Sequence, residues 1–274
     1  MKKKSKTLSV RGVCSLDGDG GKMVEKSYWE SIAGQYSLPK TIKLDPWGHY
    51  SLYKIDSVIK KYIRPTKSKT LLEIGCCPGT WLHYFNKRFG FSITGIDYGK
   101  TAVKITQKNF AILQIQGNVI CQDVFSRKIK GGPFDVVFSM GFIEHFKKPD
   151  VAIKRHILAL NKGGFLIVGV PNIHPTIYGK VQGLIDKKNL NQYRHITKEE
   201  IQNMMKKEGI RQVFCDYVGG CNFSIVDASR LPKLFRYGYY ITAKLVDFFI
   251  VHLLRIKTES SKLSPYIIYI GRKL

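Results

Sequence analysis

One stretch of the chain combines a glycine turn with carboxylates at a spacing that suits nucleoside binding. Residues 71–74 are apolar apart from Glu73, as in a short buried strand. Gly75 and Gly79 then interrupt the pattern before apolar residues return at helical spacing. Strand, glycine turn and helix let bare backbone and a helix N-terminus approach a ligand. Asp97 ends the next apolar stretch about 20 residues further on, where dinucleotide folds hold ribose hydroxyls. The spacing therefore predicts a nucleoside-binding site.

Four further segments extend this pattern along the chain. Together with the first, they read LLEIGCCPGTW (71–81), ITGIDYG (93–99), CQDVF (121–125), FDVVFSMGFIEHF (134–146) and NKGGFLIVGVPN (161–172). In this order they resemble the motifs of class I S-adenosylmethionine (SAM)-dependent methyltransferases, and the resemblance runs from about Tyr28 to the C-terminus. It is closest to the small-molecule branch that includes quinone-biosynthesis and sugar-tailoring enzymes. The resemblance implies a methyltransferase with SAM as its cofactor.

The resemblance also implies which residues hold the cofactor. They are Glu73, Gly75, Cys76 and Gly79 beside its methionine part, Asp97 on the ribose, Asp123, Tyr98 and Val124 at the adenine, and Ser139 and Met140 under the amino acid moiety. In this scheme Glu73 organises the turn through backbone amides. Asp97 is expected to bond both ribose hydroxyls, because a carboxylate offers two acceptor oxygens.

One residue of the first motif departs from the family. Cys77 stands where these enzymes usually carry a third glycine. Because cysteine is small and apolar, we expect the turn to survive, with an altered affinity for the cofactor.

Two histidines are candidates for a catalytic base. His145 follows Glu144 just beyond the predicted fourth strand, and His195 precedes a helix near residue 197. Either imidazole can take a proton from a hydroxyl near neutral pH. The resemblance favours a role for His145 in orienting the loop, and packing at the helix entry is the alternative for His195. Some quinone-biosynthesis relatives carry a metal-binding acidic residue where this chain has Gly141, so we expect no metal.

The composition indicates a globular chain with an unusual charge. Its 274 residues are 44% hydrophobic, which is enough for one sizeable core, and its formal net charge is +25. Such a charge favours polyanionic partners, although a lysine-rich solvated surface explains it equally well. The six cysteines show no metal-ligand spacing and fit reduced thiols in a cytoplasmic protein.

The order of apolar segments predicts an α/β fold, a doubly wound, mostly parallel sheet of seven strands. We expect a disordered basic tail over 1–22 and one methyltransferase domain over 23–274. Strands are predicted at 70–75, 92–97, 118–123, 134–140, 165–170, 211–218 and 266–270, with helices between most of them. The resemblance implies that the last two strands form an antiparallel edge. Residues 171–193 show little periodicity, which is typical of a lid. Trp29 and Tyr36, in a short helix over 28–36, are expected to pack on the core or contact the ligand.

The core fold does not need the insertion at about 229–257. It is predicted to form a long amphipathic helix over 231–257, with a broad apolar face and a narrow basic wedge. Charged residues interrupt it too often for a membrane span. The helix is therefore expected to cap the site, to mediate a homodimer or to lie on an anionic membrane surface.

The sequence favours a SAM-dependent methyltransferase that acts on a small or lipid-linked acceptor, at oxygen. Two alternatives stay open, an RNA ribose methyltransferase and a non-catalytic binding protein with the same fold. The segment SMGF (139–142) stands where amino-methylating nucleic-acid enzymes carry an Asn-Pro-Pro-aromatic motif, which argues against base methylation. The expected location is the cytoplasm, with peripheral membrane attachment as the variant that the 231–257 helix suggests.

Overall fold

The computed structural model describes residues 20–126, 128–254 and 259–274. Along the chain the elements are α1 (Lys26–Gly34), α2 (Tyr50–Tyr62), β1 (Thr70–Ile74), α3 (Thr80–Phe89), β2 (Ser92–Asp97), α4 (Lys100–Leu113), β3 (Asn118–Cys121), β4 (Phe134–Met140), the 3-10 turn η1 (Ile143–His145), α5 (Pro149–Leu158), β5 (Leu160–Pro171), α6 (Ile177–Leu190), α7 (Lys198–Lys207), β6 (Ile210–Val218), the 3-10 turn η2 (Phe223–Ile225), α8 (Lys233–Phe248), the π-helical turn η3 (Phe249–Leu253) and β7 (Tyr266–Lys273). All seven predicted strands are present.

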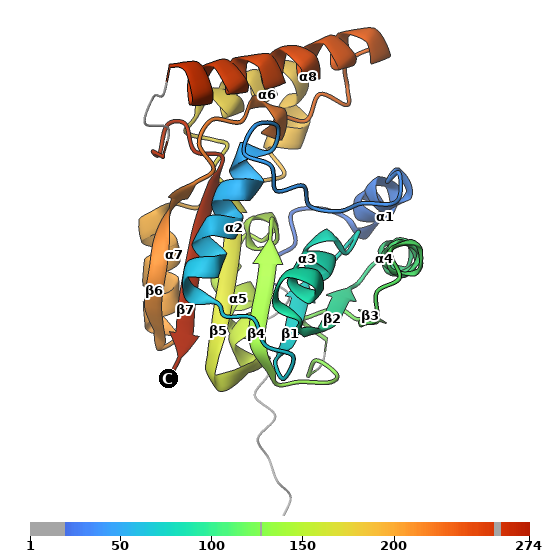
Figure 1. The fold of residues 1–274 in the computed structure, drawn as a ribbon, viewed down its shortest axis with the longest axis vertical. Coiled ribbons are helices and arrows are strands. Elements are labelled where there is room, and N and C mark those ends of the chain that lie inside the picture. The colour runs from blue at the N-terminus through green and yellow to red at the C-terminus, as the bar shows by residue number, and fades with distance from the viewer. Residues whose placement is uncertain (1–19, 127, 255–258) are drawn as a thin grey trace, which may run out of the picture.

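The sheet has the order β3-β2-β1-β4-β5-β7-β6 (Figure 1). β4 is the central strand, β1 beside it pairs in parallel with both β2 and β4, and β7 pairs antiparallel with β5 and with β6. The predicted doubly wound, mostly parallel sheet is confirmed, with β7 as its antiparallel strand. Because β1 to β4 run in one direction, their carboxyl ends meet at one edge, where such sheets bind ligands.

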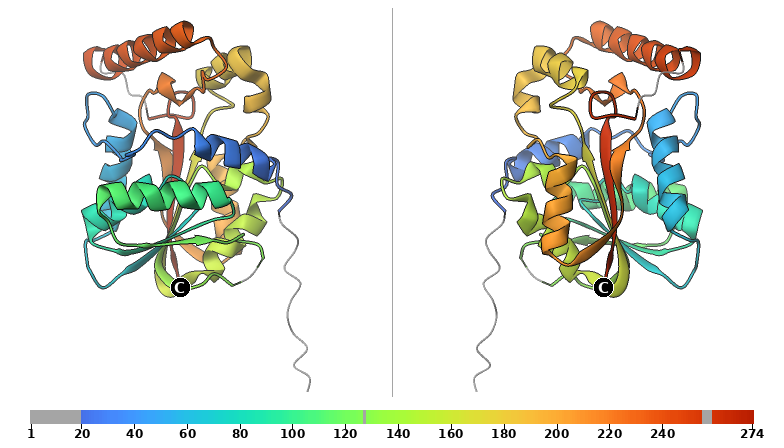
Figure 2. Two further views of the ribbon diagram at one scale, coloured as in Figure 1. Left: turned by 90° about the vertical axis from the view of Figure 1, so that its right-hand side faces the viewer. Right: turned by 90° about the vertical axis from the view of Figure 1, so that its left-hand side faces the viewer.

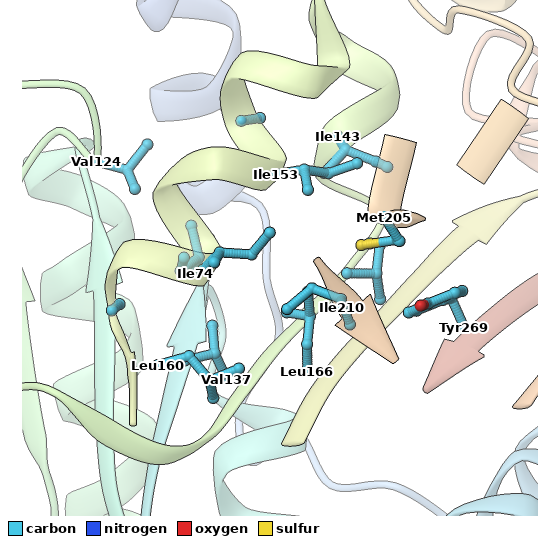
Figure 3. Close-up of a cluster of buried hydrophobic side chains, with 14 of the residues drawn as sticks. Ile74, Val124, Val137, Ile143, Ile153, Leu160, Leu166, Met205, Ile210 and Tyr269 are labelled. Carbon is cyan, nitrogen blue, oxygen red and sulfur yellow. The ribbon is translucent and has the colours of Figure 1, made fainter. Parts of the chain in front are cut away.

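Two apolar clusters hold helices on opposite faces of the sheet. On one face, α5 and α7 bury Ile153 and Met205 against Val137 and Leu166 (Figure 3). On the other face, α2, α3 and α4 pack against the sheet through a set of aromatic and aliphatic side chains that includes Ile59, Phe85, Phe110 and Phe138. Alternating residues of each strand therefore contribute to opposite cores, as the period of a strand requires.

Residues 177–190, within the 171–193 segment whose low periodicity predicted a lid, form helix α6. The sequence did not indicate this helix, for two physical reasons. Asp186 has non-helical dihedral angles, φ −152° and ψ 85°, so a kink divides the helix into two short pieces. The buried side of α6 also carries polar side chains: Gln182 and Asn189 both bond Asp227 in the loop after η2. Because of the kink and the polar side chains on its buried side, the segment has no apolar stripe with the period of a helix.

The described start of the chain packs on the domain. Most of the predicted tail lies outside the described residues, but residues 20–22, at its end, contact the loop after η1. Lys148 and Lys147 donate backbone hydrogen bonds to Gly20 and Gly21, and Lys22 forms an isolated bridge with Phe146. The ordered domain therefore begins before the predicted boundary at 23.

Helix α8 lies at the periphery of the molecule beside α6, beyond the carboxyl end of β4 (Figures 1 and 2). It covers most of the predicted 231–257 helix, and η3 continues it to Leu253. Residues 255–258 lie outside the described part of the chain. Within 20–126, 128–254 and 259–274, no helix combines the length and the apolar character needed to cross a membrane.

Candidate active site

A cavity of about 250 Å³ opens at the carboxyl edge of the sheet. The ends of β1, β2 and β4 contribute Gly75, Asp97 and Met140. Trp29 of helix α1 and Tyr36, just after this helix, line the cavity as well. Most of the wall is apolar, and the carboxylates stand on the sheet side. Of the predicted cofactor residues, those that line the cavity are Gly75, Asp97, Tyr98, Asp123, Val124 and Met140.

The glycine turn is shaped by its backbone conformation. Gly75 has a φ of +73°, and a Cβ there would lie 2.8 Å from the ring of Phe142. Gly79 has a φ of +86° and begins α3, and its amide donates to the carbonyl of Cys76. Both positions lie in the left-handed region that favours glycine. Cys77 lines the cavity and does not have a positive φ, so cysteine suits this position.

Three of the expected cofactor residues support the turn from behind and are not among the residues that line the cavity. Glu73 is buried and accepts a hydrogen bond from the Leu82 amide at 3.1 Å, in the first turn of α3. The Cys76 side chain is buried against Gly95, and Gly79 sits behind the wall against Thr106. Their role is to fix the backbone that the ligand would meet.

Asp97 presents a desolvated carboxylate to the cavity. Its Oδ1 accepts a hydrogen bond from the Gly99 amide at 2.9 Å, which holds the side chain in place. Burial raises the pKa of Asp97, and bonds from the Gly99 and Cys77 amides oppose that effect. A carboxylate of this kind gains most from a ligand that donates hydrogen bonds to it.

Asp123 lies in the loop after β3, and its carboxylate forms an ion pair with Lys22. The Lys22 ammonium is 2.6 Å from Asp123 Oδ2 and lies over the rings of Tyr98 and Phe125. Asp123 Oδ1 accepts from the Phe125 amide at 3.0 Å. A ligand that uses this carboxylate would therefore meet Lys22 as well. The sequence did not predict Lys22, because it falls within the expected tail.

Ser139 is fully buried and faces α5 instead of the cavity. Its hydroxyl lies 2.9 Å from Nε2 of His156, whose Nδ1 is 2.7 Å from the Ala152 carbonyl. Since Nδ1 donates to that carbonyl, Nε2 accepts from the serine. Ser139 thus ties β4 to α5, while its neighbour Met140 lines the cavity.

His156 predicts an acid-sensitive fold. Burial lowers the pKa of His156 to about 4, below its ordinary 6.5. The unfolded chain binds the proton more tightly, so stability is fully present above pH 6.5 and falls as the pH drops toward 4. We expect His156 to contribute about 3 kcal/mol to this loss. Urea denaturation across this window should give a shallower pH slope for His156→Gln than for wild type. Equal slopes would contradict the assignment.

His145 is the predicted base that lines the cavity. Its ring packs edge-on against Trp29, with centroids 4.7 Å apart, and its Nδ1 lies 3.1 Å from the Gln192 carbonyl. Burial lowers its pKa to about 4, so the imidazole is neutral at physiological pH. With Nδ1 donating to Gln192, Nε2 carries the free electron pair. Glu144 Oε1 lies 3.7 Å from this same Nε2, and burial raises the pKa of Glu144 to about 8.

His195 is not among the residues that line the cavity. It is exposed, and its ring centroid lies 5.9 Å from that of His174. Burial and the neighbouring His174 lower its pKa. Thr197 caps α7 by accepting from the Glu200 amide at 3.1 Å. Among the described residues, no cluster of three or more metal-ligating side chains is present.

The segment that carries this site matches a known protein family. The methyltransferase domain family matches residues 47–217, more than half of the chain. The chain belongs to this methyltransferase family. The match spans β1 to β6 and thus the sheet edge that carries the cavity. The methyltransferase predicted from the sequence motifs is therefore confirmed.

Relatives and solved structures agree with the family and its fold. The chain is 27% identical over 124 residues to a ubiquinone biosynthesis O-methyltransferase of Coxiella burnetii, covering 44% of this chain and 53% of the relative. It is 27% identical over 92 residues to a ribosomal RNA large subunit methyltransferase E of Bdellovibrio bacteriovorus, covering 32% and 46%. The chain thus spans about half the length of the curated relatives it matches.

The structure of a Haemonchus contortus phosphoethanolamine N-methyltransferase 2, solved with S-adenosylhomocysteine, superposes with a TM-score of 0.55 at 16% identity. The match covers 79% of this chain and 51% of that one. It confirms the class I methyltransferase fold predicted from the motifs.

Proposed function

We propose that the protein transfers a methyl group from SAM to an oxygen atom of a small or lipid-linked acceptor. The observation that carries the proposal is the cavity at the carboxyl edge, where the Asp97 carboxylate and the Gly75 backbone meet under an apolar cover. Family membership supports methyl transfer. The name of the Coxiella relative, an O-methyltransferase, supports oxygen as the accepting atom.

The described residues fit the parts of SAM. The positive φ of Gly75 and the Phe142 ring beside it leave no room for a side chain, so backbone faces the cavity there. Asp97 offers an acceptor to ribose hydroxyls, and Tyr98 and Val124 offer apolar surface to the adenine. When bound, SAM supplies an electrophilic methyl group on a sulfonium centre. The chain itself aligns the reactants, excludes water and accepts the acceptor's proton.

His145 is the group that we propose for that proton. Its imidazole is neutral, lines the cavity and has Nε2 as the acceptor nitrogen. His195 does not line the cavity. We therefore propose His145 as the base, with Trp29 and Tyr193 holding the ring by aromatic contact.

The test of the function is incorporation of label from SAM. The protein is incubated with methyl-labelled SAM and with separate lipid, metabolite and RNA extracts. We expect label in a lipid or metabolite fraction as an ether or ester that an Asp97→Ala variant does not form. Calorimetry with SAM runs in parallel. SAM binding without transfer to any extract would favour the non-catalytic alternative, and absence of SAM binding would overturn the proposal.

RNA ribose methylation is the second candidate. The net charge of +25 and the similarity to the Bdellovibrio ribosomal RNA enzyme favour it. Label in the RNA extract at a 2′-hydroxyl, with none in lipid or metabolites, would establish it in place of the first candidate.

Cys77 is expected to act only as a small turn residue. Burial raises the pKa of its thiol to about 12, so it is not an ionised nucleophile at neutral pH. Cys77→Gly should bind SAM at least as well as wild type, as measured by calorimetry. It should also retain turnover. A variant that binds SAM normally and has lost turnover would instead assign the thiol a chemical role.

A further inference from the structure

Helix α8 presents most of its apolar side chains to solvent and turns Asp247 and Tyr239 toward the domain. Ala243 is its one buried residue. The carboxylate of Asp247 accepts from the Phe223 amide at 2.8 Å, and the Tyr239 hydroxyl donates to the Phe223 carbonyl at 2.9 Å. These contacts fasten α8 to η2. The arrangement is the reverse of an ordinary surface helix, whose apolar stripe faces the core.

The outward face is long and strongly apolar. The exposed fractions are 82% for Leu234, 51% for Ile241, 65% for Leu245 and 50% for Phe249. At 100° per residue these four side chains fall on one side of the helix. An exposed apolar surface of this size marks a contact with a partner or a membrane.

The charge beside this face is positive. Lys233 and Lys244 are exposed on one flank of α8, and Asp247, the one acidic residue of the helix, is turned toward η2. On α6, which lies beside α8 (Figure 2), Lys187 and Lys188 are also exposed by their accessible area. An apolar face with basic residues along its edge is complementary to an anionic bilayer interface.

Trp47 extends the same face onto a second segment. It is 65% exposed, and its ring lies 4.6 Å from that of His252 and 6.1 Å from that of Phe248. Tryptophan favours the level of lipid headgroups, because its ring is apolar and its N–H is polar. A loop residue and a helix separated by almost 200 positions thus form one apolar surface.

We propose that this surface, the outward face of α8 with Trp47, docks the protein on membranes that contain anionic lipids. The face lies beyond the same sheet edge that carries the cavity (Figure 1). Docking would place the proposed active site near a lipid-linked acceptor, and in this respect the inference extends the proposed function. The docking itself stands on α8 and does not require the methyl transfer.

Vesicle co-sedimentation tests the proposal, with the full chain. We expect wild type to sediment with phosphatidylglycerol-containing vesicles at low salt, to bind pure phosphatidylcholine vesicles weakly, and to dissociate as salt rises. Ile241→Gln/Leu245→Gln should lower the partition coefficient about 10- to 100-fold, since it removes two inserted side chains. Lys233→Gln/Lys244→Gln should lower it about tenfold, and only for anionic vesicles.

A matched control variant replaces two exposed apolar side chains with glutamine on other helices. Ile112 and Leu158 are 46% and 58% exposed on α4 and α5, and Ile112→Gln/Leu158→Gln should bind vesicles as wild type does. Wild type that ignores anionic vesicles at low salt would overturn the proposal, as would equal loss in the control. Sedimentation velocity adds a further check: a dimer that Ile241→Gln/Leu245→Gln dissociates would assign the face to a second copy. SAM affinity is measured for each variant. A variant that loses vesicle binding and keeps its SAM affinity has lost docking alone, whereas absent SAM binding in wild type would count against the proposed function.

Discussion

Replacing Asp97 with alanine is expected to weaken SAM binding by roughly 2 to 4 kcal/mol, about 30- to 1,000-fold in Kd. The carboxylate already pays a desolvation penalty, visible as a raised pKa, and only part of it is offset by the Gly99 and Cys77 amides. Ribose hydroxyls would supply the missing donors. The alanine variant loses these charge-assisted bonds, while the apolar walls of the cavity stay in place. Titration calorimetry at neutral pH measures the difference.

The control removes one negative charge without touching the cavity. Asp150 is exposed in the first turn of α5, so Asp150→Ala should leave the Kd unchanged. A thermodynamic cycle sharpens the assignment: adenosine should compete better than 2′-deoxyadenosine on wild type, and this preference should vanish in Asp97→Ala. An alanine variant that folds normally and binds SAM with wild-type affinity would refute the ribose assignment.

The sheet could be predicted because its signals are local. Apolar runs such as residues 71–74 are bounded by glycine or carboxylate, and each reads as one strand without reference to its neighbours. The ligand edge follows from the parallel order, since carboxyl ends then coincide. Asp97 and Gly75 were thus placed in the site from the sequence. Nothing local indicates which way a side chain turns after a strand ends, and this is why Ser139 was expected in the cavity and is buried against His156.

The missed contacts are the ones made between distant segments. Glu30 of α1 accepts from the Lys100 and Thr101 amides at 2.8 Å and so caps α4 from about 70 positions away. Lys22 reaches Asp123 across 101 positions of the sequence. Neither pairing has a sequence signal, because capping and ion pairing between elements depend on how those elements pack. The α8 face belongs to the same class: its composition predicted an amphipathic helix, but only the contacts of Asp247 and Tyr239 define the outward side.

Loss of the His145 imidazole should reduce turnover with little change in SAM affinity. A positioned base contributes about 10²- to 10⁴-fold to a proton-transfer step, so His145→Ala should lower kcat by that order once an acceptor is known. In the proposed role, the neutral ring, with Nδ1 bonded to the Gln192 carbonyl, would offer Nε2 to the acceptor hydroxyl. Because Trp29 and Tyr193 hold the ring, a packing defect is the competing explanation for any loss. Chemical rescue distinguishes the two.

Imidazole added in solution should restore part of the activity of His145→Ala, because it can enter the space left by the ring and accept the proton. It should not restore His145→Gln, in which the larger side chain fills that space. His195→Gln is the matched control, since His195 is the other histidine candidate and stands outside the cavity lining; its kcat should stay within about twofold of wild type. Rescue of neither variant, with kcat and Tm falling together, would reduce His145 to a packing role. A large loss in His195→Gln alone would move the base to that side of the molecule.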